Sequence, residues 1–91
     1  MNSSWRIVTW IELFRKYKLN MEIEKLIKMA NQIGDFFEAY PDDEDAKKGI
    51  ANHLHNFWNS IMINSIVTHV KQKQGVGLHP RVIEAIQQHI A

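Results

Sequence analysis

Apolar residues recur at intervals of three and four along most of the chain, which is the spacing of a helix that buries one face. Between residues 21 and 40 the positions that follow this rule are Ile23, Leu26, Ile27, Ala30, Ile33, Phe37 and Tyr40. Asn20 precedes the run and is a suitable N-cap, and Pro41 ends it because proline cannot continue a helix. The pattern predicts a first helix over residues 21–40.

Two further helices are predicted from a boundary signal followed by an apolar stripe. Four consecutive acidic residues, 42–45, complement the positive end of a helix dipole and mark the second start. The stripe that follows consists of Ala46, Ile50, Leu54 and Phe57, with Trp58 at its edge. Asn59-Ser60 then offers an N-cap for a third helix. That helix is expected to bury Met62, Ile63, Ile66, Val67 and Val70.

A fourth helix is predicted at the end of the chain. Gly75-Val76-Gly77 breaks the third helix, and Pro80 is suited to the first position of the next. Its stripe consists of Val82, Ile83, Ile86 and Ile90. No stretch alternates with period two, so strands are not expected. We therefore predict an all-α fold, a small bundle of about four helices.

The first twenty residues form a separate amphipathic segment. One helical face would carry Ile7, Trp10, Ile11, Phe14 and Tyr17. The segment has four basic residues and one acidic residue, whereas the remainder has seven and nine. We predict an N-terminal extension, residues 1–20, with a possible fifth, amphipathic helix, and a helical domain over residues 21–91. Membrane binding through Trp5, Trp10 and the basic residues around Arg15 is the least favoured interpretation of the segment.

Composition narrows the classes of function. Ninety-one residues allow one domain, and a net charge of +1 does not indicate a nucleic-acid partner. The absence of cysteine excludes disulfides, thiolate metal sites, iron–sulfur ligation and a cysteine nucleophile, and fits a cytoplasmic location. No apolar run approaches the ~20 residues that cross a bilayer.

Candidate chemistry is sparse. His53 and His55 lie two apart, so on a helix they point about 200° away from each other and cannot share a metal ion. The clustered carboxylates fit a solvated helix start better than acid–base catalysis. We predict no catalytic, metal-binding or cofactor-binding residues in this chain.

The first helix has more apolar surface than one core requires. With Met29 and Phe36 included, its apolar side chains cover an arc of roughly 180°, against the ~100° of an ordinary stripe. Met29, Phe36 and Tyr40 form the surplus flank. A polar strip of Asn31, Gln32, Asp35 and Glu38 lies beside it. A solvated helix face and a surface that docks on another protein both remain open as interpretations.

Several separated motifs, in order, resemble one known family. They are Lys28-Met29-Ala30-Asn31-Gln32-Ile33-Gly34-Asp35-Phe36-Phe37, Tyr40-Pro41, Gly49-Ile50-Ala51-Asn52-His53-Leu54, Phe57-Trp58 and Gly77-Leu78-His79-Pro80. This pattern resembles the delta subunit of NAD-dependent, molybdenum-containing formate dehydrogenase over most of the chain after residue 20. Asn59-Ser60 departs from the family's Asp-Pro after the tryptophan.

The resemblance implies a non-catalytic accessory subunit of a cytoplasmic complex that oxidises formate and reduces NAD. The alpha subunit of such a complex holds the molybdenum bis-pterin cofactor and iron–sulfur clusters, and other subunits hold flavin and further clusters. The implied role is to dock on the alpha subunit and stabilise it or help it mature. A transient, chaperone-like assembly factor that leaves the mature enzyme is the alternative.

The resemblance also suggests which residues contact the partner. Together with the surplus flank, the expected interface consists of Met29, Asn31, Gln32, Asp35, Phe36, Tyr40, Asn52, His53 and Trp58. Gly34 is expected to permit a close helix approach, since a glycine inside a helix costs ~1 kcal/mol relative to alanine. Phe37, Ile50, Leu54 and Phe57 are assigned to the core.

Overall fold

The computed structural model describes residues 22–91, and every regular element in that range is a helix. A helix over residues 22–37, called helix 22–37 below, is followed by α2 (Asp43–Phe57), α3 (Ser60–Lys73) and α4 (Pro80–His89). This confirms the predicted all-α fold of about four helices. The predicted extension, residues 1–20, lies outside the described residues.

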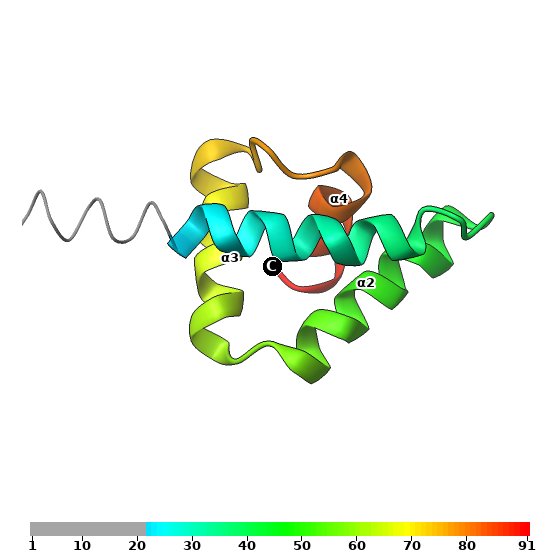
Figure 1. Ribbon diagram of the computed structural model, residues 1–91, viewed down its shortest axis with the longest axis horizontal. Helices are drawn as coiled ribbons and strands as arrows, with labels where there is room; N and C mark the ends of the chain where they lie inside the picture. The colour runs from blue at the N-terminus through cyan, green and yellow to red at the C-terminus, as the bar shows by residue number, and fades with distance from the viewer. Residues whose placement is uncertain (1–21) are drawn as a thin grey trace, which may run out of the picture.

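The helices form a small bundle in which helix 22–37 crosses in front of the other three (Figure 1). α2 and α3 meet at a sharp corner, and α4 packs more extensively against α2 than against α3. The connection from α3 to α4 passes along one side of helix 22–37 (Figure 1). Helix 22–37 therefore packs against more than one of the other helices.

The core lies where the predicted apolar stripes meet. Its largest fully buried side chains are Ile50, Leu54, Ile66, Val82 and Ile86. Leu26 and Ala30 contribute from helix 22–37, and Leu78 closes the core from the last connection. The period of three and four therefore identified most of the buried face correctly.

Local signals fix the helix starts where the sequence predicts them. The Asp42 carboxylate accepts a hydrogen bond from the Asp45 N–H at 2.9 Å, and the Asn59 side chain accepts one from the Met62 N–H at 2.9 Å. Pro80 occupies the first turn of α4. Each cap satisfies an N–H group that has no partner inside the helix.

Helix 22–37 ends three residues before the predicted end at Tyr40. Residues 38 and 39 form a turn, and Arg81 on α4 donates from Nη1 to the carbonyl of Phe37 at 2.9 Å. The same nitrogen lies 3.5 Å from the carbonyl of Glu38. The Phe37 carbonyl also accepts the Tyr40 N–H at 3.1 Å, so the turn and a side chain distant in sequence together satisfy a carbonyl that has no helical partner at this end.

Phe57 and Trp58 differ in burial from what the sequence predicts. Trp58 is 7% exposed and belongs to the core, whereas Phe57 is 72% exposed. The cause is that α2 ends at Phe57, and Trp58 adopts an extended conformation with φ −99° and ψ 140°. The 100° helical step no longer applies there, so the backbone turns the indole inward. The assignment of Phe57 to the core was wrong, and Trp58, which was predicted as a partner contact, is buried in the core of this chain.

Two glycines meet specific steric demands. A Cβ on Gly34 would lie 2.6 Å from Val82 Cγ2, so Gly34 permits the close approach of helix 22–37 to α4, as predicted. Gly77 has a φ of +90°, in the left-handed region that favours glycine. It allows the chain to turn from α3 toward α4.

Candidate docking site

A surface groove lies between helix 22–37 and α2. Its volume is about 420 Å³, and it is lined by Met29, Gln32, Ile33, Phe36, Phe37 and His53. We call it the aromatic groove. Four of the residues predicted for a partner interface, Met29, Gln32, Phe36 and His53, come together here from two helices.

Two aromatic side chains, Phe36 and Phe37, line the aromatic groove, and Tyr40 lies beside Phe37 outside that lining. The Phe37 ring lies 5.0 Å from the Phe36 ring in an edge-to-face arrangement and 4.9 Å from the Tyr40 ring. Phe36 is 70% exposed and Tyr40 is 42% exposed. Phe37 packs directly against Gly49 of α2, where a Cβ would overlap its ring. The glycine therefore allows Phe37 to lie close to α2, and Phe37 in turn supports the two exposed rings.

His53 continues the surface along α2. Its ring centroid lies 4.6 Å from that of Phe57 at an interplanar angle of 35°. His53 is partly buried and Phe57 is exposed. Phe57 is thus a surface residue beside the aromatic groove that the sequence analysis missed. Phe57 is the last residue of α2, and the sequence carries no separate signal for its exposure.

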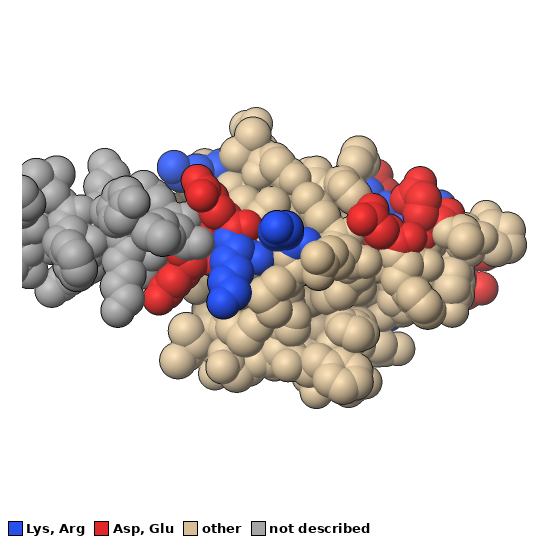
Figure 2. Space-filling view, viewed as in Figure 1, with Lys and Arg blue, Asp and Glu red and all other residues tan. Residues whose placement is uncertain are grey.

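The lining of the aromatic groove carries no Asp, Glu, Lys or Arg. The lack of charge extends further, since no such residue occurs anywhere between Gly49 and Val70. Figure 2 shows charged side chains gathered toward the two ends of helix 22–37, with a broad uncharged area below. Depletion of charge and exposed aromatic side chains are features of the central part of protein interfaces.

Two other predicted interface residues, Asn31 and Asp35, contact residues of this chain. Asn31 donates from Nδ2 to the Gly77 carbonyl at 2.9 Å and accepts the His79 N–H at 2.9 Å. The Asp35 Oδ1 atom lies 3.3 Å from His79 Nδ1. These two residues face the connection before α4 rather than the aromatic groove. Asn52 is exposed on α2 outside the lining of that groove.

A charged network joins α2 to α4 on another side of the molecule. Lys47 is buried, and its Nζ lies 3.1 Å from Asp43, 2.8 Å from Glu44 and 3.6 Å from Glu84. Hydrogen bonds to Glu44 and Asp43 raise the pKa of Lys47 above its ordinary value of 10.5. Sequence reasoning assigned the acidic run to the helix start alone, although the Asp43–Lys47 spacing of four also allows an ion pair.

Arg81 completes this network. Its Nε donates to Asp43 Oδ1 at 3.0 Å. The hydrogen bond from Lys47 is the largest cause that holds the pKa of Asp43 below its ordinary value of 3.8, and the bond from Arg81 adds to it. The network fixes the relative positions of α2 and α4, and we assign it to structure.

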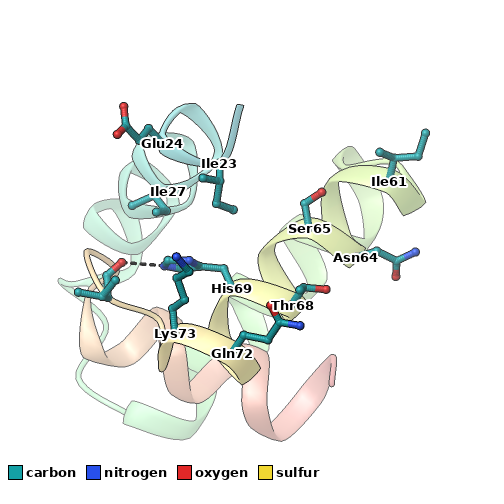
Figure 3. Close-up of a pocket in the computed structure, with 11 residues that line it drawn as sticks. Ile23, Glu24, Ile27, Ile61, Asn64, Ser65, Thr68, His69, Gln72 and Lys73 are labelled. Carbon is teal, nitrogen blue, oxygen red and sulfur yellow. Dashed lines mark hydrogen bonds between the residues drawn. The ribbon is translucent and has the colours of Figure 1, made fainter. Parts of the chain in front are cut away.

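A second, wider groove of about 770 Å³ lies between helix 22–37 and α3 (Figure 3). Its α3 side is largely polar, with Asn64, Ser65, Thr68 and Gln72, whereas Ile23 and Ile27 approach from the other helix (Figure 3). His69 at its base donates from Nε2 to the Val76 carbonyl at 2.7 Å. This histidine therefore anchors the turn after α3.

Within residues 22–91 no three His, Cys, Asp or Glu side chains are grouped as a metal site would require. None of the helices described is long and apolar enough to cross a membrane. Over the residues described, the chain is thus a small all-α protein whose surface has an uncharged groove lined in part by aromatic residues.

Comparison with known proteins identifies the family. Residues 25–86 match the family of the NADH-dependent formate dehydrogenase delta subunit FdsD, and the chain belongs to this family. The matched range contains the whole aromatic groove. No curated protein and no solved structure matches the chain significantly.

Proposed function

We propose that this chain is a non-catalytic accessory subunit of a cytoplasmic NAD-dependent formate dehydrogenase and docks on the molybdenum-containing alpha subunit through the aromatic groove. Membership of the delta-subunit family supports the assignment to the enzyme. The observation that supports this docking surface most directly is that one uncharged groove is lined by Met29, Phe36 and His53.

The chemistry of the groove supports binding rather than catalysis. Its polar side chains are one amide, Gln32, and one imidazole, His53, among apolar and aromatic neighbours. Burying such a surface against an apolar partner displaces water and so lowers the free energy of the complex. The few polar groups fix the orientation of the partner. We propose that the chain binds no cofactor itself, and that the molybdenum bis-pterin, iron–sulfur, flavin and NAD sites belong to the other subunits.

The test is capture of the alpha subunit from the native cytoplasm by the tagged full-length chain. Phe36→Asp places a charge in the groove and should lower capture at least tenfold, whereas Val76→Asp is the matched control. Val76 is 67% exposed, similar to Phe36 at 70%, but lies outside the aromatic groove. Equal capture by the wild type and the Phe36→Asp variant, with both folded, would overturn the docking surface.

A transient assembly factor is the alternative, because it would need the same docking surface. It predicts capture of a cofactor-poor alpha subunit alone. A permanent subunit predicts capture of the active enzyme in fixed stoichiometry, so the composition and activity of the eluate separate the two roles.

A further inference from the structure

The wider groove between helix 22–37 and α3 has no role in the docking surface proposed above. Its volume of about 770 Å³ exceeds that of the aromatic groove, and we call it the α3 groove (Figure 3). Two of its apolar lining residues are strongly exposed, Ile61 at the start of α3 by 75% and Val76 after the end of α3 by 67%. Ile23 and Ile27 contribute apolar surface from helix 22–37.

The face of α3 that lines the groove has few charges for an exposed helix face. Its five residues lie within an arc of roughly 100°, since they follow the helical period. They are Ile61, Asn64, Ser65, Thr68 and Gln72, all exposed and none charged. In the whole lining the charged side chains are one anion, Glu24, and one cation, Lys73. A segment that packs along this face of α3 would therefore displace water without burying a charged side chain of α3.

The chain itself holds a segment beside the α3 groove. Helix 22–37 begins at residue 22, and the next two residues, Ile23 and Glu24, line the groove. Residues 1–20 are therefore tethered at this groove, whereas the aromatic groove lies between helix 22–37 and α2. A tether makes binding intramolecular, so the segment has a high effective concentration that a separate partner lacks.

The apolar pattern of residues 1–20 matches such a position. The predicted helix in this segment would have an apolar face without a partner in its own sequence, formed by Ile7, Trp10, Ile11, Phe14 and Tyr17. The indole N–H of Trp10 needs an acceptor when it is buried, and the amide and hydroxyl oxygens on α3 can accept it.

The length of the segment is sufficient to cover the groove. α3 has 14 residues and is roughly 21 Å long. A helix over residues 4–17 would have the same length as α3, and residues 18–21 would remain for the reversal of the chain. Connections between packed helices commonly take ~2–8 residues. The segment can therefore lie along the whole exposed face of α3.

Net charge favours the same pairing. Residues 1–20 have four basic residues and one acidic residue, whereas residues 21–91 have seven and nine. The two parts of the chain thus have opposite net charges, which attract one another.

We propose that residues 1–20 bind in the α3 groove as an amphipathic helix and cover Ile61 and Val76. This inference goes beyond the proposed function, because both binding surfaces belong to this chain. It gives the N-terminal segment a structural role and leaves the aromatic groove free for the alpha subunit.

The experiment measures proximity in the full-length chain by nuclear magnetic resonance. Because the chain has no cysteine, Thr9→Cys offers one attachment site for a nitroxide spin label. Thr9 lies opposite the predicted apolar face, so the label leaves that face free. Amide signals of residues 61–72 should lose at least half their intensity, whereas those of residues 43–50, at the other end of the molecule, should not (Figure 1). Unchanged signals in α3 would overturn the proposal.

Variants of the segment test whether its apolar face is responsible. Combined Trp10→Asp and Phe14→Asp should restore the α3 signals of the spin-labelled chain. Val8→Asp is the matched control, because Val8 is apolar but lies outside the predicted face, and it should leave the signal loss in place. A signal loss that persists in the double variant would contradict binding through this face.

A variant of the groove provides a second, independent test. Thr68→Lys adds a cation at an exposed position of the α3 groove and should restore the signals, since the approaching segment is basic. His55→Lys adds the same charge at an exposed position of α2 outside both grooves and should leave the signal loss in place. Equal signal loss in these two variants would overturn the assignment to the α3 groove.

A mixing experiment separates this proposal from association of two copies. Spin-labelled chain without an isotope label is mixed with isotopically labelled chain that has no spin label. The α3 signals should keep their intensity in the mixture, and a loss there would assign the groove to a second copy and overturn the proposal. Any of these failures would leave the capture experiment with Phe36→Asp unaffected, because that experiment concerns the aromatic groove.

Discussion

Among individual residues, Asp43 has the most informative surroundings. Its carboxylate contacts Lys47 on the same helix and Arg81 on α4, and it belongs to the first turn of α2. One side chain thus supports a helix end and a contact between helices. Its ionisation should therefore affect the stability of the fold.

The pH dependence of stability should reveal this role. Because the pKa of Asp43 in the folded chain lies below its ordinary value of 3.8, its contacts add stability above pH 3.8. That contribution is lost as the pH falls through the folded pKa. The melting temperature of Asp43→Asn should fall furthest below that of the wild type near neutral pH, and the two should converge in acid. Thermal melts over this range check it, and a constant difference would contradict it.

The opposite environments of Leu54 and Phe57 predict opposite sensitivities. Leu54 is fully buried, so Leu54→Ala should destabilise the chain by about 2–5 kcal/mol through lost burial and a cavity. Phe57 is 72% exposed, so Phe57→Ala should change stability by only about 0.5 kcal/mol. Chemical denaturation of the two variants is the measurement. A large loss in Phe57→Ala would show that the ring is buried after all.

At the scale of elements, Asn31 joins helix 22–37 to the connection before α4. Its amide makes two hydrogen bonds, one to the Gly77 carbonyl and one from the His79 N–H. At about 1 kcal/mol for each bond, Asn31→Ala should destabilise the chain by about 2 kcal/mol in urea denaturation. Asn31→Asp keeps the acceptor for the His79 N–H but places a carboxylate oxygen where Nδ2 faces the Gly77 carbonyl, so it should lose stability as well. Equal stability of Asn31→Ala and the wild type would show that these two hydrogen bonds do not contribute to the free energy of unfolding.

Gly34 tests the close packing of helix 22–37 on α4. Alanine is the better helix former by about 1 kcal/mol, yet its Cβ would lie 2.6 Å from Val82 Cγ2. Gly34→Ala should therefore destabilise the chain by about 1–3 kcal/mol. Combined with Val82→Ala, which removes the opposing methyl groups, the same change should cost less. Strictly additive free energies in this double-mutant cycle would contradict the packing.

The sequence predicts those elements whose signals are local. Asp42, Asn59 and Pro80 mark helix starts that depend on hydrogen bonds or a fixed φ within a few residues. The end of helix 22–37 is a turn over residues 38 and 39 that also receives a hydrogen bond from Arg81, which lies more than forty residues away in sequence. Periodicity cannot supply such a contact, and for this reason the predicted helix was three residues too long.

The same distinction applies to the candidate site. The surplus apolar arc included Met29 and Phe36, which both line the aromatic groove, although Met29 also packs against the core. It could not show that Asn31 is occupied by the Gly77 connection. Nor could it show that the chain leaves the helical conformation at Trp58, which turns the indole into the core, while Phe57 remains exposed.

At the scale of the whole molecule, the charged network lies outside the lining of the uncharged groove, although its Arg81 also donates to the backbone carbonyl of Phe37. Lys47, Asp43 and Arg81 connect α2 to α4, while the aromatic groove is lined by no charged side chain. The network can hold the helices in place without adding charge to the surface that we propose for docking. This arrangement suits an accessory subunit whose contribution is a preformed binding surface.

The most direct test of the central claim is co-purification of the tagged full-length chain from its native cytoplasm. The eluate is analysed by mass spectrometry for subunit stoichiometry and assayed for formate-dependent NAD reduction. The account predicts an active formate dehydrogenase with this chain in fixed ratio to the alpha subunit. An eluate that contains no formate dehydrogenase subunit would contradict it.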